Sequence, residues 1–157
     1  MPFPNDLLEQ AYHLASREPK RPKQASLRRA VSTAYYALFH LLSSETAKNW
    51  RRPAERSTLA RMFEHGSMAR VCFRKCDELN TYFETRPAEG RELTVLRHIL
   101  LIASTFVRMR QYRELADYDS SAKWTRDAVA EGAEESGREI SRRTGGGVSG
   151  SVSPSFT

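Results

Sequence analysis

The sequence predicts an all-α fold, built as a bundle of about five helices. Apolar residues recur at the spacing of a helical face along most of the chain, and no segment shows the apolar–polar alternation of a half-buried strand. The 157 residues, of which 39% are hydrophobic and 28% charged, fit one folded domain rather than a disordered chain. A chain of this length can bury about 70% of its unfolded surface without disulfides or a metal.

Helical spacing, capping residues and chain breakers set the boundaries of the predicted helices. In chain order, these helices span residues 6–17, 25–47, 58–64, 68–84, 92–115 and 122–142. Asn5 is the expected N-cap of the first helix, and Pro19 ends it because proline disfavours a helical residue before it. His65-Gly66 separates the two short segments, and residues 86–90 break the chain before the long helix. Residues 117–121 are predicted to form the turn before the last helix.

The segment 25–47 has the strongest helical pattern in the chain. Its apolar positions cover a wide arc, so the middle of this helix should be buried on most sides. One polar stripe remains on it, formed by Arg29, Thr33, Tyr36 and His40. Along the long helix at 92–115, a line of apolar residues is expected to face the core: Leu93, Leu96, Leu100, Ala103 and Val107.

Composition divides the chain into a domain and a tail. Residues 1–143 are expected to form a single helical domain. Residues 144–157 are rich in Gly and Ser and poor in apolar side chains, so they are predicted to be a disordered tail that the fold does not need.

Several classes of protein are not expected from this sequence. The longest apolar run, residues 99–103, is too short to cross a membrane, and residues 1–10 lack the basic start of a secretory signal. Cys72 and Cys76 lie four residues apart on a predicted helix, where their side chains diverge, which favours a reduced pair in a cytoplasmic protein. No metal-binding motif is present, and the glycine run 145–147 lacks the flanking strand and Lys of a phosphate loop. We expect neither metal nor cofactor.

Positive charge is the most informative feature of the composition. Lys and Arg number 25 against 19 Asp and Glu, a net charge of +6, which favours an anionic partner. One basic set lies in and beside the connectors: Lys20, Arg21, Lys23, Arg28, Arg29, Lys48, Arg51 and Arg52. A second set, Arg108, Arg110 and Arg113, lies near the end of the long helix, where cations complement the helix dipole. The alternative interpretation is phosphate recognition by guanidinium groups, and Asp117, four residues after Arg113, would orient that side chain.

Histidines supply the second group of candidate residues. His40 lies on the polar stripe with Tyr36 and Arg29, either as a hydrogen-bonded structural histidine or as part of a site. His65 is expected near a helix C-terminus, and His98 on the surface. None of them lies in a motif that specifies general-base chemistry.

Three short motifs together resemble a known family. They are R-R-A-V-S-T-A-Y-Y-A-L-F-H over Arg28 to His40, the His65-Gly66 pair, and R-E-L-A-D-Y-D over Arg113 to Asp119. In this order they resemble the HEPN family in its small stand-alone prokaryotic branch, over about residues 5–142. The resemblance implies an all-α bundle of four to five helices that is usually a homodimer. Many members are metal-independent ribonucleases, toxins of toxin–antitoxin pairs, or partners of minimal nucleotidyltransferases.

One departure from the family pattern leaves two functions open. Ribonucleases of the family carry an Arg, four to six residues and then a His; Arg113 matches the Arg, but Tyr118 to Ser120 contain no histidine. The first hypothesis is a binding module for a nucleotide, RNA or a partner protein such as an antitoxin or a nucleotidyltransferase. Its candidate binding residues are Arg113, Asp117, Tyr118, Arg110, Tyr36 and His40. The alternative is a metal-independent ribonuclease with Arg113, His40 and His65 as candidate catalytic residues.

Overall fold

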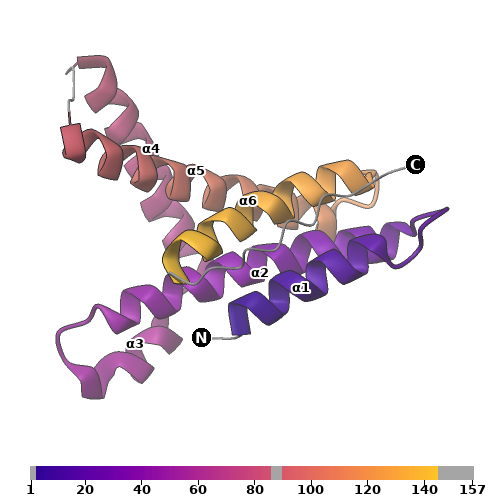
Figure 1. Ribbon diagram of the computed structural model, residues 1–157, viewed down its shortest axis with the longest axis horizontal. Coiled ribbons are helices and arrows are strands. Elements are labelled where there is room, and N and C mark those ends of the chain that lie inside the picture. The colour runs from indigo at the N-terminus through magenta and orange to yellow at the C-terminus, as the bar shows by residue number, and fades with distance from the viewer. Residues whose placement is uncertain (1–2, 86–89, 145–157) are drawn as a thin grey trace.

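The computed structural model describes residues 3–85 and 90–144, and these residues form helices and no strand (Figure 1). In chain order the helices are α1 (Phe3–Ser16), α2 (Gln24–Lys48), α3 (Arg56–Met62), α4 (His65–Thr85), α5 (Gly90–Tyr118) and α6 (Arg126–Thr144), with the 3₁₀ turn η1 (Pro53–Glu55) before α3. The predicted all-α bundle is confirmed. Of the predicted tail, residues 144–157, only Thr144 is described, and it is the last residue of α6. The rest of the predicted tail lies outside the described residues. None of the described helices is long and apolar enough to span a membrane.

Helix α2 is the centre of the bundle, because α1, α5 and α6 all pack against it. Its side chains Leu27, Tyr35, Leu38 and Leu41 are almost completely buried, which confirms the wide apolar arc. Thr33 is an exception to the predicted polar stripe: it is buried, and its hydroxyl donates to the carbonyl of Arg29 in the preceding turn.

The core consists of two main apolar clusters along α2. One surrounds Tyr35 and Leu38 of α2 and includes Phe106 and Met109 of α5. The other contains Leu27 and Val31 of α2 and Val129 of α6, together with Trp124 from the α5–α6 connection. The first cluster lies beneath the polar site described below.

Helix α4 and the first half of α5 project from the bundle as a pair of helices (Figure 1). The expected core line of α5 is therefore wrong in this half: Leu93, Leu96 and Leu100 are only partly buried, because here α5 packs mainly against α4. Val107 is also only partly buried, whereas Ala103 is buried as predicted. The projecting pair leaves several large apolar side chains exposed: Val71, Phe73, Val95, Ile99 and Leu101.

Several helix boundaries differ from prediction, for local reasons. Helix α1 already includes Asn5, because Pro4 in the first turn has a backbone angle suited to a helix start. His65 and Gly66 do not separate helices; they begin α4, and the break falls at Phe63, which is extended.

Helix α5 continues through Asp117 and Tyr118, which were predicted to lie in a turn, and α6 starts at Arg126 rather than near residue 122. Arg28 of α2 explains where α5 ends. Its Nη1 donates to the carbonyl oxygens of Ala116 (2.9 Å) and Asp119 (2.8 Å). Its Nη2 donates to the carbonyls of Ser120 and Ala122. One guanidinium therefore satisfies carbonyl groups that the end of a helix would leave without partners.

We predict that Arg28→Ala lowers the free energy of unfolding by about 2 kcal/mol, since hydrogen bonds to charged groups contribute about 1.5–3 kcal/mol. Urea unfolding measures this loss. The matched control is Arg29→Ala, at an exposed neighbouring position of α2, which should leave stability within about 0.5 kcal/mol of the parent. Equal effects of the two substitutions would contradict a capping role for Arg28.

Candidate anion-binding site where α2, α4 and α5 meet

Three residues of α2, spaced one helical turn apart, each contact the end of α5. They are Arg28, Ser32 and Tyr36, here called the α2 polar row. Residues four apart lie on one helix face, so the row forms a line along α2. The predicted polar stripe ran through Arg29 and Thr33 instead, one position away, and only Tyr36 belongs to both.

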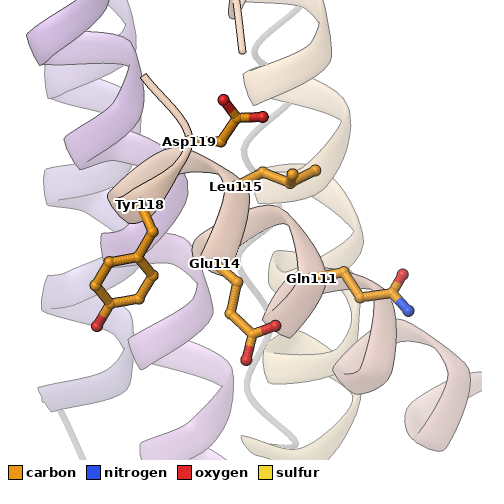
Figure 2. A pocket seen from close by; sticks show the side chains of 5 residues that line it. All are labelled: Gln111, Glu114, Leu115, Tyr118 and Asp119. Carbon is orange, nitrogen blue, oxygen red and sulfur yellow. The ribbon is translucent and has the colours of Figure 1, made fainter. Parts of the chain in front are cut away.

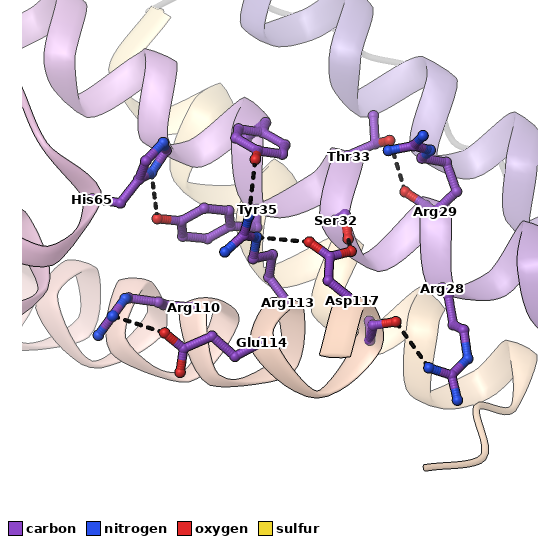
Figure 3. A network of polar contacts seen from close by, with 12 residues as sticks. Arg28, Arg29, Ser32, Thr33, Tyr35, His65, Arg110, Arg113, Glu114 and Asp117 are labelled. Atoms are coloured by element: carbon purple, nitrogen blue, oxygen red, sulfur yellow. Dashed lines mark hydrogen bonds and ion pairs between the residues drawn. The ribbon is translucent and has the colours of Figure 1, made fainter. Parts of the chain in front are cut away.

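Arg113 lies at the centre of this contact (Figure 3). Its Nη2 donates to the Tyr36 hydroxyl at 3.3 Å, and its Nε lies 2.8 Å from Oδ2 of Asp117. The second contact is a close ion pair rather than an aligned hydrogen bond, since Nε lacks a hydrogen-bond partner. The predicted Arg113–Asp117 pair is therefore present. Among the described residues, Nη1 of Arg113 has no partner, and 22% of the side chain is exposed.

Asp117 also accepts a hydrogen bond from α2. The Ser32 hydroxyl donates to its Oδ1 at 2.5 Å, and Ser32 is 1% exposed. The carboxylate thus connects a buried α2 hydroxyl to the Arg113 guanidinium. This geometry differs from an ordinary exposed i, i+4 pair, because the acid cannot turn away from the arginine without leaving Ser32 unpaired.

Two tyrosine rings lie near the Arg113 guanidinium. The guanidinium carbon is 5.9 Å from the Tyr36 ring centroid and 5.4 Å from that of Tyr118, within the range of cation–π contacts. Burial acts to lower the pKa of Arg113, but Tyr36 and Asp117 more than offset this and raise it. Arg113 is therefore a permanent cation with a fixed orientation.

His65, at the start of α4, lies on the same site. Its Nδ1 is 2.7 Å from the Tyr35 hydroxyl, and its ring packs on that of Phe39 at a tilt of 32°, with centroids 3.9 Å apart. Burial raises the pKa of Tyr35 to about 12, so this phenol stays neutral. Burial, and then the charge of Arg113, lower the pKa of His65. Since Nδ1 is engaged by Tyr35, only Nε2 is left for a ligand, as donor or acceptor according to the tautomer.

Arg110 completes the cationic face, one turn before Glu114. The two side chains form an ion pair at 2.7 Å, so both Arg110 and Arg113 have a carboxylate four residues later. The carboxylates offset much of the local positive charge. Any anion bound here is recognised by directed N–H groups more than by net charge.

Other candidate residues do not join the site. His40 lies against Phe3, with ring centroids 5.0 Å apart, and burial lowers its pKa. Arg29 is exposed, and Arg108 pairs with Glu135 of α6.

The connector cations do not form one patch, because they flank opposite ends of α2. Lys48, the last residue of α2, is paired with Glu45, and Arg52, in the connector after it, is paired with Glu55. Cys72 and Cys76 are free thiols, and burial raises the pKa of Cys72 to about 11, which disfavours the reactive thiolate.

Sequence reasoning missed Ser32 and Tyr35 as site residues and misplaced His65. Ser32 and Tyr35 are polar residues within the apolar arc of α2, and a buried hydroxyl there needs a partner, either the carbonyl one turn back, as for Thr33, or a group on a neighbouring helix. That need for a partner was the signal by which the sequence could have identified Ser32 and Tyr35.

In comparisons with known proteins, no family model, curated protein or solved structure matches the chain. No group of three or more potential metal-binding side chains occurs in the part of the chain that the structure describes.

We predict that the His65 ring titrates below the usual histidine pKa of about 6.5, and that Arg113→Gln raises its pKa toward that value. A histidine with a lowered pKa binds fewer protons in the folded state than in the unfolded state. It therefore reduces stability as the pH falls through about 6.5. NMR titration of the imidazole resonances measures the pKa directly. Lys20→Ala, in the α1–α2 connector, should leave it unchanged; an identical titration in the parent and in Arg113→Gln would contradict the proximity of His65 and Arg113.

Proposed function

We propose that this protein is a HEPN-like binding domain that recognises a phosphate group of RNA or of a nucleotide through Arg113. The supporting observation is the fixed guanidinium of Arg113, held by Tyr36 and Asp117 with Nη1 left for a ligand. Guanidinium groups bind phosphate oxygens through paired N–H donors, and a fixed side chain loses little entropy on binding. Arg110 and Arg113 are both close enough to His65 to lower its pKa, and the chain carries a net charge of +6.

The competing interpretation is a purely structural one, in which Arg113 only joins α5 to α2. Its contacts with Tyr36 and Asp117 would serve that role too. The structural interpretation accounts for Nη2 and Nε but assigns no role to Nη1, which has no partner among the described residues. The two interpretations predict different effects of removing the Arg113 side chain. If Arg113 binds phosphate, its removal lowers the affinity for the ligand; if it only joins α5 to α2, its removal lowers the stability of the fold.

We predict that Arg113→Ala lowers the affinity for single-stranded RNA at least tenfold, equivalent to about 1.4 kcal/mol. The melting temperature should change little, because Asp117 keeps its bond to Ser32. Binding of the parent should also weaken with salt, since phosphate recognition releases counterions, and Arg113→Ala should make this dependence shallower. Fluorescence anisotropy with labelled RNA at two salt concentrations measures both effects. Lys20→Ala is the control for diffuse charge; equal losses from the two substitutions would exclude a localised site at Arg113.

A second candidate function, metal-independent RNA cleavage, is favoured by the position of His65. The family pattern places its histidine after the arginine; here the imidazole near Arg113 comes from α4 instead. In the tautomer whose Nδ1–H donates to the Tyr35 oxygen, Nε2 carries a lone pair and can accept a proton. It would take the proton of a ribose 2′-OH as that oxygen bonds to phosphorus and the P–O5′ bond breaks; the departing O5′ takes a proton from water, and Arg113 stabilises the charge on the phosphate.

If this candidate function is correct, purified protein cleaves single-stranded RNA in the presence of EDTA. His65→Gln and Arg113→Ala should each reduce the rate by at least about a hundredfold, as expected for loss of a general base or of a charge-stabilising group. His98→Gln, at an exposed histidine of α5, is the control. Gel analysis of end-labelled RNA measures the rates. Absence of cleavage, with binding retained, would leave the binding function alone.

The homodimer and the partner proteins belong to the same proposal. Support for self-association comes from the projecting α4–α5 pair, with its exposed Val71, Phe73 and Leu101. An apolar groove of about 420 Å³, lined by residues of α2, α4 and α5 among others, adds to this surface. An antitoxin or a nucleotidyltransferase is the partner class that the family resemblance implies.

A further inference from the structure

Tyr118 is the most exposed large hydrophobic side chain in the described part of the chain, at 75%. An exposed tyrosine alone is unremarkable on a protein surface. What distinguishes Tyr118 is that its backbone is fixed from two directions. It is the last residue of α5, and the next N–H, of Asp119, still donates to the carbonyl of Leu115 at 3.1 Å. Arg28 binds the carbonyls of Ala116 and Asp119, on either side of it.

Two features border the Tyr118 ring: the Arg113 guanidinium and an open depression on the protein surface. The Arg113 guanidinium carbon lies 5.4 Å from the ring centroid. The ring also borders an open depression of about 820 Å³ on the surface of α5, lined by Gln111, Glu114, Leu115 and Asp119 (Figure 2). Because three quarters of the residue is exposed, a flat ligand can reach the ring from the side of the depression.

The depression and the Arg113 site suit different chemical groups. Glu114 and Asp119 place carboxylates in the depression; Oε1 of Glu114 pairs with Arg110 and Oδ1 of Asp119 accepts from Ser121, so their other oxygens remain as acceptors and the depression offers a phosphate no cation of its own. Carboxylates and the Gln111 amide instead accept hydrogen bonds from amino and ring N–H groups, which nucleobases carry on their edges. Tyr118 and Leu115 add apolar surface for the faces of such a ring. A phosphate donor site and a surface suited to a heterocycle therefore adjoin at Tyr118.

We propose that Tyr118 stacks on an unpaired nucleobase of an RNA strand whose phosphate binds at Arg113, so that the protein selects single-stranded over double-stranded RNA. This inference rests on the proposed phosphate-binding function and names its substrate class. In a duplex both faces of each base are covered by neighbouring bases, so only an unpaired base can stack on a protein ring. Stacking on an aromatic side chain tolerates every base, which predicts little sequence preference.

The test compares two labelled RNA strands of equal length and charge, one with all bases and one in which the central nucleotides are abasic. The parent should bind the complete strand about tenfold more tightly than the abasic strand, as expected for stacking of one base on an aromatic ring. Tyr118→Ala should remove this difference by weakening only the complete strand, whereas Tyr118→Phe should keep it. Trp50→Ala, at another exposed aromatic side chain, in the connector after α2, is the matched control. Duplex RNA should bind the parent no more tightly than the abasic strand.

The outcomes separate this inference from the function on which it rests. If both strands bind the parent equally and Arg113→Ala weakens both, the phosphate site is real and the base site is wrong. If Tyr118→Ala weakens both strands equally, Tyr118 acts only by orienting Arg113, and the base site is again overturned. If neither strand binds in an Arg113-dependent way, the proposed function fails as well, and Tyr118 is left as a contact for another class of partner, such as a protein.

Discussion

The α2 polar row fixes the end of α5 to the centre of the bundle, and the geometry of the candidate site depends on that contact. Arg28 holds the carbonyls at the helix end, Ser32 holds Asp117, and Tyr36 holds Arg113. These bonds lie beside apolar side chains that are almost fully buried, where an unpaired polar group would be costly. The Ser32 hydroxyl therefore helps to fix the position of Asp117, and through it that of Arg113.

The same contact explains why α5 has two different halves. Its C-terminal half is held against α2 by both packing and polar bonds, with Phe106 and Met109 in the core. Its N-terminal half leaves the bundle with α4 as its main neighbour and keeps apolar side chains such as Val95 and Leu101 exposed. The candidate site lies toward the bundle end of α5, where His65 at the start of α4 approaches Arg110 and Arg113.

Paired charges give the site its chemical character. A cluster of unpaired arginines would attract any polyanion, with strong dependence on salt and little on structure. Here Arg110 and Arg113 each face a carboxylate of the next turn, so the local field is small while the N–H groups are well directed. Such an arrangement favours a ligand that matches the donor geometry, and the exposed Tyr118 ring adds a contact independent of charge.

The sequence by itself determined the helical class, the central position of residues 25–47 and the Arg113–Asp117 pair, because each depends on spacing within a single helix. It did not determine which polar residues of α2 face α5. Arg29 and Thr33 differ from Arg28 and Ser32 by one position, which rotates a side chain by about 100° around the helix axis. Only packing against a second helix decides which of them is buried. The prediction for the end of α5 was wrong for a related reason: Asp117 favours a turn in isolation, and here a hydrogen bond from Ser32 and the ion pair with Arg113 hold it in the helix. His65 reached the site only through tertiary structure, since nothing within its own segment relates it to an arginine 48 positions later along the chain.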